Sequence, residues 1–199
     1  MGEDLGIFYL SEEIGPGLPL WLPNGEVIRN ELEQYMRMVE TKYGFKYVST
    51  PHITKGKMYE KTGHLPYYAE IMFAPIEIEG VDYYLKPMNC PHHHMIYNKI
   101  VKSYRSLPLR LAEPGMVYRN ELSGVTYGLM RVKAIMQNDA HIYLTANQLK
   151  DEFLKVLEMF EEVYKVMGIK DYYFKLSLPD FKGKHDKFIG DPKEWAHVS

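Results

Sequence analysis

One segment of this chain, residues 110–143, constrains the fold more than any other. A first strand is expected to end at residues 116–118, where a loop with two glycines begins. Beyond this loop, over residues 129–136, apolar side chains stand at alternate positions. Because alternation of period two is typical of a strand with one buried face, the segment predicts a strand, a turn-rich loop and a second strand.

Polar side chains are unusually numerous in this predicted hairpin. In a hairpin without a binding site such groups would face water. The alternation alone does not distinguish such a hairpin from one that carries a binding site. Their order points to a site, because two arginines flank the loop while a carboxylate and an imidazole follow on one strand. A guanidinium fork matches phosphate oxygens, a carboxylate can receive an amino group, and an imidazole can bind a metal ion. The candidate residues are Arg119, Glu121, Arg131, Gln137, Asp139 and His141.

The same residues resemble a signature of a known family. Three stretches, Arg119-x-Glu121, Gly128-Leu-x-Arg131-Val and Gln137-x-Asp139-Ala-His141, resemble the second signature motif of class II aminoacyl-tRNA synthetases. The form of the motif is that of the threonyl-tRNA synthetases. The zinc-bearing segment of that family resembles Lys86-Pro87-Met88-Asn89-Cys90-Pro91-His92-His93. The resemblance extends from about Leu5 to about Leu178. It implies an α+β fold with a mixed, mainly antiparallel sheet flanked by helices.

The resemblance implies a pocket for threonine. In the family, a zinc ion bound by one cysteine and two histidines holds the amino and hydroxyl groups of threonine. Cys90 and His141 match two of these three ligands by motif. Asp139 matches the residue that receives the amino group, and Gln137 and Met88 match its neighbours in the pocket. Zinc is therefore expected as a cofactor, in an incomplete site, and threonine as a substrate.

ATP with Mg²⁺ and tRNA are the other partners that the resemblance implies. Arg119 matches the arginine that grips the α-phosphate of ATP, Arg131 matches one that holds the distal phosphates, and Glu121 belongs to the same motif. Ile135 stands where the family has a phenylalanine that stacks on adenine. Catalysis in such a site is expected to come from positioning and charge stabilisation, without a general acid or base.

The strand that follows Arg131 departs from the family pattern at four adjacent positions, which hold Lys133, Ala134, Ile135 and Met136. Ala134 replaces a glycine that lets the ligand approach, and Met136 places a long apolar side chain where a small polar one is usual. If Ile135 and Met136 fill the nucleotide pocket, the chain is a non-catalytic scaffold engineered from such a domain.

Some parts of the family's catalytic domain have no counterpart in this sequence. No arginine follows Arg131, so the third signature motif with its ATP-binding arginine is missing. The later histidines, His185 and His197, do not resemble the third zinc ligand, and editing and anticodon-binding domains are missing too. Residues 1–199 are therefore expected to form a single partial catalytic domain. It would be a fragment of a threonine–tRNA ligase with weak or no activity of its own.

The segment before the hairpin resembles the first motif of the family. Apolar residues at spacings of three and four predict a helix over residues 26–43, which Gly44 ends. A short strand over residues 45–49 is expected to stop at Pro51, because proline cannot donate to a sheet ladder. In the family this motif builds the dimer interface, so a homodimer through residues 26–51 is expected.

Several shorter elements complete the prediction. In chain order they are a turn at Asn24-Gly25, a helix over 54–62, strands at 72–73 and 81–85 around a turn at Glu79-Gly80, a helix over 92–101, a helix that Thr145 caps and Gly168 ends, and a strand over 172–178. Histidines 92 to 94 would point about 100° apart on their helix, so at most one could join Cys90 on a metal ion.

The bulk properties exclude several classes of protein. The formal net charge is -2 and no block of Lys or Arg stands out, which does not support binding of nucleic acid through a broad basic face. The single cysteine, Cys90, forbids an internal disulfide and fits a reducing compartment. No apolar run approaches a membrane span and the N-terminus lacks a secretion signal, so a cytoplasmic protein without membrane contact is expected.

The sequence leaves three functions open. The first is a fragment of a threonine–tRNA ligase, and the second is the non-catalytic scaffold. The third is a small metal-binding protein that uses Cys90, His141 and a neighbouring histidine. Threonine-dependent exchange of pyrophosphate into ATP separates the first from the second, and zinc content separates the third from both.

Overall fold

The structure is a computed structural model that describes residues 1–177. The chain divides into two compact units, Met1–Val163 and Tyr164–Ser199. The first unit combines helices with two three-stranded sheets and a two-stranded one, so the predicted α+β fold is confirmed. Its short elements outside the two larger sheets are β1 (Phe8–Tyr9) and β2 (Leu20–Trp21), which pair antiparallel, and the single-turn helices η1 (Ala69–Ile71), η2 (Tyr104–Ser106) and η3 (Ser123–Val125).

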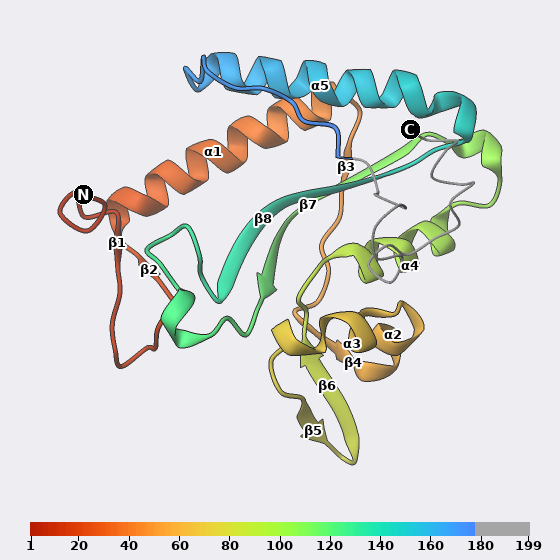
Figure 1. Ribbon diagram of the computed structural model, residues 1–199. Helices are drawn as coiled ribbons and strands as arrows, with labels where there is room; N and C mark the ends of the chain where they lie inside the picture. Colours follow the sequence, from red (N-terminus) through yellow and green to blue (C-terminus); the bar gives the residue numbers. More distant parts are fainter. Residues whose placement is uncertain (178–199) are drawn as a thin grey trace. The chain divides into compact units, whose positions relative to one another are not determined.

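Two long antiparallel strands, β7 (Leu109–Tyr118) and β8 (Ala134–Tyr143), form the centre of the first unit (Figure 1). Their register runs from Leu109 opposite Tyr143 to Tyr118 opposite Ala134, and β3 (Lys46–Tyr47) adds a parallel strand beside β7. The predicted strand, loop and strand are therefore confirmed, and the sheet is mixed as expected.

The second strand begins later than the sequence predicted, at Ala134 instead of residue 129. An isolated bridge between Tyr127 and Arg131 closes a small turn, and Gly128 adopts a positive φ of 48° within it. This turn directs residues 127–131 away from the ladder with β7, so Arg131 lies in the loop rather than on the strand.

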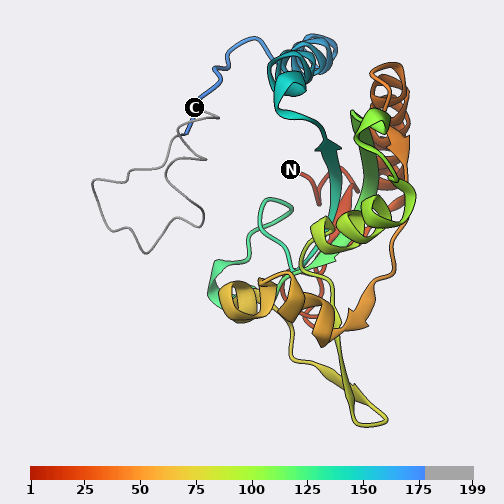
Figure 2. The same ribbon diagram turned by 90° about the vertical axis from the view of Figure 1, so that its right-hand side faces the viewer.

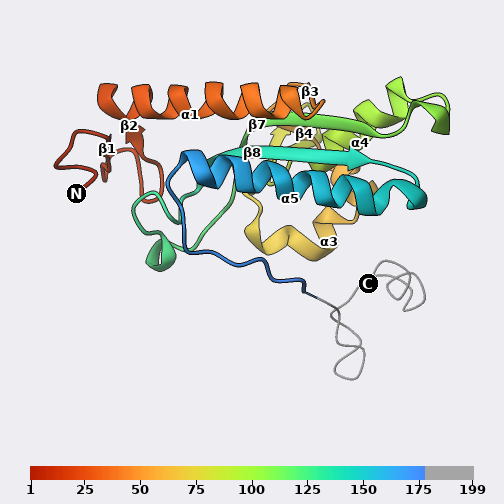
Figure 3. The same cartoon turned by 90° about the horizontal axis from the view of Figure 1, so that it is seen from above.

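The pleat of β7 and β8 separates two sets of side chains, because successive residues of a strand point to opposite faces. Helices α1 (Pro23–Lys42) and α5 (Leu149–Val166) lie along one face (Figures 1 and 3). Asn138 of β8 donates to Glu40 of α1 at 2.9 Å, and Arg110 of β7 forms a two-pronged ion pair with Glu152 of α5. Even-numbered residues of β7 and β8 therefore face α1 and α5, and odd-numbered residues face the other side.

Helix α1 begins at Pro23, three residues before the predicted start, and it includes the Asn24-Gly25 pair. The prediction of a turn at this pair is wrong. Proline suits the first helical position, where no amide hydrogen is needed. Gly25 serves close packing instead of a turn, because a Cβ atom there would lie 2.0 Å from the carbonyl oxygen of Ile7.

A second sheet, with strand order β4-β6-β5, lies with two short helices at the end of β7 (Figures 1 and 2). The amide of Tyr118, the last residue of β7, donates to the carbonyl of Lys86 at 2.9 Å and so joins the two sheets. The elements here are β4 (Ile53–Lys55), α2 (Gly56–Lys61), α3 (His64–Tyr68), β5 (Ile76–Ile78) and β6 (Val81–Leu85).

The sequence predicted this region only in part. Strand β6 and the turn at Glu79-Gly80 are confirmed, and both turn residues have positive φ angles of 53° and 73°. The predicted helix over residues 54–62 is wrong in its first turn, where β4 pairs with β6. The strand predicted at residues 72–73 is also wrong, because the partner of β6 lies at β5.

The last described helix is confirmed at both ends. Thr145 and Gln148 form a reciprocal capping box at η4 (Ala146–Gln148), α5 follows directly, and Gly168 adopts a φ of 71° after the helix. The strand predicted over 172–178 is wrong for residues 172–177, which form no strand, and residue 178 lies outside the described part. Instead, the ring of Tyr172 packs edge-on against the rings of Tyr164 and Phe174.

No helix within residues 1–177 is long and apolar enough to cross a membrane.

Candidate functional site

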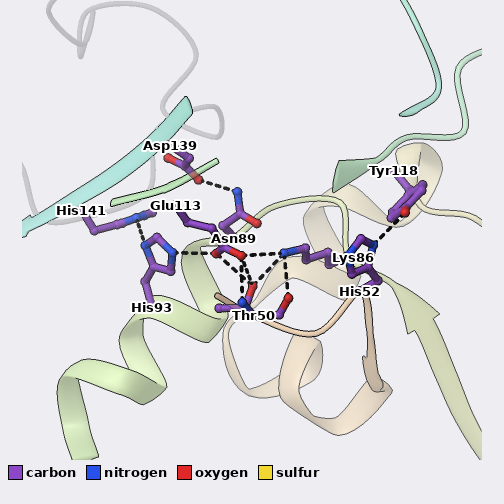
Figure 4. Close-up of polar contacts among 9 residues, drawn as sticks. All are labelled: Thr50, His52, Lys86, Asn89, His93, Glu113, Tyr118, Asp139 and His141. Atoms are coloured by element: carbon purple, nitrogen blue, oxygen red, sulfur yellow. Dashed lines mark hydrogen bonds and ion pairs between the residues drawn. The ribbon is translucent and has the colours of Figure 1, made fainter. Parts of the chain in front are cut away.

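The odd-numbered residues of β7 and β8 meet helix α4 (Cys90–Ile100) on the face away from α1. This helix was predicted from residue 92 and begins two residues earlier, with Asn89 before it and Pro91 in its first turn. Glu113 of β7 and Asp139 and His141 of β8 contact side chains of this segment (Figure 4). We call this face, with the start of α4, the α4 face.

A buried carboxylate, Glu113, lies at the centre of the α4 face. Its oxygens accept from the amide of Thr50 at 2.8 Å and from the Thr50 hydroxyl at 3.0 Å. The ammonium of Lys86 lies 3.4 Å from the same carboxylate and donates to the Thr50 hydroxyl at 2.7 Å. Lys86 is 1% exposed and Glu113 4% exposed, so two opposite charges are paired away from water.

Burial by itself raises the pKa of the Glu113 carboxyl. The hydrogen bonds from His93 and from the amide of Thr50, together with the charge of Lys86, outweigh burial and lower this pKa to about 2. Glu113 is therefore ionised at any pH near neutrality, and its oxygens can only accept hydrogen bonds.

His93 connects this carboxylate to the candidate residue His141. Nε2 of His93 lies 3.0 Å from Oε2 of Glu113, and Nδ1 of His93 lies 2.8 Å from Nδ1 of His141. The His93 side chain is fully buried. Burial is the main cause that lowers the pKa of His141, while the charge of Asp139 acts in the opposite direction.

Asn89 holds the second candidate residue of β8. Its Nδ2 donates to Oδ2 of Asp139 at 3.0 Å, and its side chain is fully buried. A Cβ atom on Gly115 would lie 2.5 Å from Nδ2 of Asn89, so a glycine at this position of β7 makes room for the amide. No separate signal in the sequence singles out Asn89, although this residue lies inside the segment that resembles the zinc-bearing motif.

Cys90 is half-buried at the start of α4. Burial raises the pKa of its thiol, the charge of Asp139 raises it further, and the charge of Arg119 lowers it. One turn along the same helix, His93 binds His141, so α4 and β8 bring both predicted zinc ligands to the α4 face.

These residues do not by themselves complete a zinc site. Within residues 1–177, no three His, Cys, Asp or Glu side chains form a group that could hold a metal ion. Cys90 and His141 supply two donors of the kinds that zinc prefers, a sulfur and an imidazole nitrogen. The neighbouring His93 uses both ring nitrogens in hydrogen bonds, which does not support the third predicted function, a small metal-binding protein that uses a neighbouring histidine.

The other two histidines of α4 face different surroundings. His92 is 7% exposed, and its ring nitrogens have no hydrogen-bond partner among the described residues. Burial, with help from the charge of Lys86, lowers the pKa of His92 to about 4. Nδ1 of His94 lies 2.8 Å from the hydroxyl of Tyr143, whose ring stacks on Tyr97 at 4.2 Å. The three histidines thus point in different directions, as the helical spacing predicted.

The candidate phosphate-binding residues lie in the loop after β7. Nε of Arg119 approaches the carbonyl of Pro87 at 3.5 Å, and Arg119 is half-buried. Nε and Nη2 of Arg131 donate to one oxygen of Glu121 at 3.0 and 2.8 Å. The Arg131 side chain is 56% exposed, so the ion pair with Glu121 is open to solvent on the arginine side.

The pleat separates the remaining candidates on β8. Gln137 and Ile135 have odd numbers, so alternation places their side chains on the α4 face with Asp139, although part of Ile135 also borders the cavity described next. Met88, directly before Asn89, is half-buried. Met136 lies on the opposite face, where it lines an apolar cavity of about 310 Å³ with Leu32 and Met36 of α1, among others. Met136 therefore lies away from the face that holds Asp139 and His141.

The Glu113 carboxylate makes stability depend on pH. Its pKa is lowered from 4.5 to about 2, so it stabilises the fold above the unfolded value, and this contribution is lost as the pH falls from 4.5 towards 2. The loss is on the order of 3 kcal/mol, at ~1.4 kcal/mol per unit of pKa.

We expect the free energy of unfolding in urea to fall more steeply for the wild type than for Glu113→Gln between about pH 5 and pH 3. The exposed Glu31→Gln serves as the control and should follow the wild type. Parallel curves for Glu113→Gln and the wild type would contradict the assignment.

Comparison with known proteins agrees with this geometry. Residues 73–195 match the tRNA synthetase class II core domain (G, H, P, S and T). Threonine–tRNA ligase of Thermobifida fusca is 46% identical over 199 residues, which are 100% of this chain and 30% of that protein. The enzyme of the same name from Thermus thermophilus is 46% identical over 200 residues, covering 98% of this chain and 30% of that protein. The chain thus spans about 30% of the length of these curated relatives.

Solved structures show the same fold. The RNA binding domain of threonyl-tRNA synthetase from Cryptosporidium parvum superposes with a TM-score of 0.87 at 34% identity, over 99% of this chain and 48% of that one. Prolyl-tRNA synthetase of Giardia lamblia, in complex with prolyl-adenylate, shares the fold with a TM-score of 0.71 at 20% identity, over 82% of this chain and 34% of that one. With the match over residues 73–195, the chain belongs to the family of class II tRNA synthetase core domains.

Proposed function

We propose that this chain supplies the threonine-binding part, and part of the ATP-binding part, of a threonine–tRNA ligase. The observation that carries the proposal is the convergence of Asp139, His141 and Cys90 on the α4 face, where buried partners position the first two. The relatives that are 46% identical over the whole chain are named threonine–tRNA ligases, which supports threonine as the amino acid. Activation of threonine by ATP and its transfer to tRNA are the activity of the whole enzyme.

Asp139 is the residue that receives the ammonium group of threonine. Asn89 binds Oδ2 of this carboxylate and leaves Oδ1 for the ligand. Because Asn89 is fully buried and packs against Gly115, the carboxylate is held in place before the amino acid arrives. Gln137 lies on the same face two residues earlier, which supports its role as a neighbour of the bound amino acid.

Arg119 acts on the α-phosphate of ATP. Its Nε approaches the carbonyl of Pro87 at 3.5 Å, in the segment that leads into α4 and Cys90. There it can neutralise the charge that develops when the threonine carboxylate attacks the phosphorus. Arg131 would hold the distal phosphates, and to do so it exchanges its ion pair with Glu121 for the phosphate oxygens. No residue needs to act as an acid or base, because positioning and charge suffice.

The 199-residue polypeptide by itself should be a weak catalyst. Only two zinc donors come together within residues 1–177, and no arginine follows Arg131 in the sequence. One missing charged group of this kind typically costs on the order of 3 kcal/mol, which is about a hundredfold in rate. The scaffold alternative lacks comparable support, since Met136 points away from the α4 face.

The test of function is threonine-dependent exchange of pyrophosphate into ATP. We expect exchange by the purified chain to be at least about a hundredfold slower than by a full-length relative. Arg119→Lys should lower the remaining exchange by a further tenfold or more, on the order of 1.4 kcal/mol for a lost fork of donors. Arg105→Lys, an exposed arginine on η2, should leave it unchanged. An exchange rate within about tenfold of that of the relative would contradict the prediction that this chain is a weak catalyst. Exchange that survives Arg119→Lys would remove this residue from the site.

We also propose Cys90 and His141 as two ligands of a zinc ion that, when bound, holds the amino and hydroxyl groups of threonine. The purified chain should retain little zinc after dialysis, because two protein donors bind it weakly. Added zinc should bind more tightly to the wild type than to Cys90→Ser, in a titration against a competing chelator. Equal affinity of the two proteins would exclude Cys90 as a ligand.

A homodimer through residues 26–51 is the last part of the proposal. Helix α1 exposes a set of large apolar side chains that a second copy of the chain could cover: Val27 at 62%, Ile28 at 46%, Leu32 at 46% and Met38 at 62%. The apolar cavity between α1 and β8 opens beside Leu32 and extends this surface.

Sedimentation at micromolar concentration should show a dimer that Leu32→Glu converts to monomer. Burying a new carboxylate at the interface would cost several kcal/mol. Leu154→Glu is the matched control, since Leu154 is also 46% exposed but lies on α5. A wild-type chain that sediments only as a monomer would contradict this part of the proposal.

A further inference from the structure

We infer that Glu113 and His93 form a relay that fixes the tautomer of His141, so that Nε2 of His141 presents its lone pair on the α4 face. The relay is a chain of three hydrogen-bonded groups, one from β7, one from α4 and one from β8 (Figure 4). The tautomers follow from the contacts themselves. Only their use in holding a zinc ion rests on the proposed function.

The relay starts at an acceptor that cannot donate. The Glu113 carboxylate accepts hydrogen bonds from the amide and the hydroxyl of Thr50. The ammonium of Lys86 lies 3.4 Å away and balances its charge. Every neighbour of the two oxygens therefore presents a hydrogen or a positive charge, and an ionised carboxylate has no hydrogen to give. The group at 3.0 Å from Oε2, Nε2 of His93, must carry the proton of that hydrogen bond.

His93 then has only a lone pair left at its other nitrogen. The charges of Lys86 and Glu113 already balance, so a neutral imidazole keeps this buried cluster neutral, whereas a protonated one would add an uncompensated charge. His93 is fully buried, which makes such a charge costly. With its single hydrogen on Nε2, the neutral ring is an acceptor at Nδ1.

The acceptor state of His93 Nδ1 determines which nitrogen of His141, on β8, carries the hydrogen. The Nδ1 atoms of His93 and His141 lie 2.8 Å apart, a distance at which one nitrogen donates and the other accepts. Because Nδ1 of His93 accepts, Nδ1 of His141 donates, and Nε2 of His141 keeps a lone pair. This nitrogen has no hydrogen-bond partner among the described residues, and Asp139 lies on the same face of the same strand. His93 and Glu113 thus act as positioning residues, and the atom left free is the one that would bind zinc.

One substitution should exchange the donor and acceptor in each hydrogen bond of the relay. In Glu113→Gln, the amide oxygen can still accept from the amide of Thr50, which places the new amide nitrogen towards His93. That nitrogen donates, so Nε2 of His93 becomes an acceptor and its hydrogen moves to Nδ1. Nδ1 of His141 then accepts, and its hydrogen moves to Nε2. The protonated Nε2 no longer has the lone pair that it presents in the wild type.

The experiment is a long-range nitrogen–proton correlation spectrum of the ¹⁵N-labelled full chain, without metal, threonine or ATP. Recorded near pH 8, above the ordinary histidine pKa of about 6.5, it distinguishes the two neutral tautomers of each ring. We expect the hydrogen on Nε2 in His93 and on Nδ1 in His141 for the wild type, and the reverse for both in Glu113→Gln.

Glu152→Gln is the matched control, because Glu152 is also a buried carboxylate bound to a β7 residue, Arg110, but lies apart from the relay. It should leave both tautomers as in the wild type. A wild-type His141 with its hydrogen on Nε2, or a Glu113→Gln spectrum without reversal, would overturn the inference. If Glu113→Gln fails to fold, the wild-type spectrum still decides. Since no substrate is present, the relay can hold while the exchange assay rejects the proposed function.

Discussion

The pairing of the buried Glu113 carboxylate with its donors is the interaction on which the rest of this structure depends. An ion removed from water loses several kcal/mol of hydration, which only close and complete hydrogen bonding can offset. The donors come from separate parts of the chain: Thr50 follows β3, Lys86 follows β6, and His93 belongs to α4. A shift of any of these elements would leave a buried charge without its partner. The carboxylate therefore fixes the positions of four segments at once, including the helix that carries Cys90.

The alternation of β7 and β8 determines what each side of the sheet can do. One face lies against α1 and α5, where Glu40 pairs with Asn138 and Glu152 pairs with Arg110. The other face holds Glu113, Asp139 and His141 against α4. A slip of one residue in the register of β8 would exchange the two sets. The site is thus as well specified as the register, which ten residue pairs between Leu109 and Tyr143 hold in place.

Much of this arrangement could be predicted from the sequence, because its signals are local. The period-two pattern predicted the two strands, and the motif Gln137-x-Asp139-Ala-His141 supplied three candidates that the observed strand places on one face. The same rule places Met136 on the opposite face, because it stands three positions before Asp139. Asn24-Gly25 misled because its glycine serves close packing with Ile7 instead of a turn. The relay through Glu113 and His93 could not be predicted, since its members are brought together only by the tertiary fold.

The two halves of the proposed site differ in how firmly they are held before a ligand binds. Asp139 and His141 are fixed by bonds to Asn89 and His93, both fully buried, where breaking a hydrogen bond costs about 1–3 kcal/mol. Arg131 is 56% exposed, and an ion pair such as its pair with Glu121 is worth roughly 0–1 kcal/mol. Arg119 makes one long contact of 3.5 Å with Pro87. The amino-acid half is therefore formed in advance, while the phosphate grip can rearrange at small cost. Because preorganised groups lose less freedom on binding, the proposed function assigns discrimination between amino acids to the α4 face and contact with the charged nucleotide to the arginines.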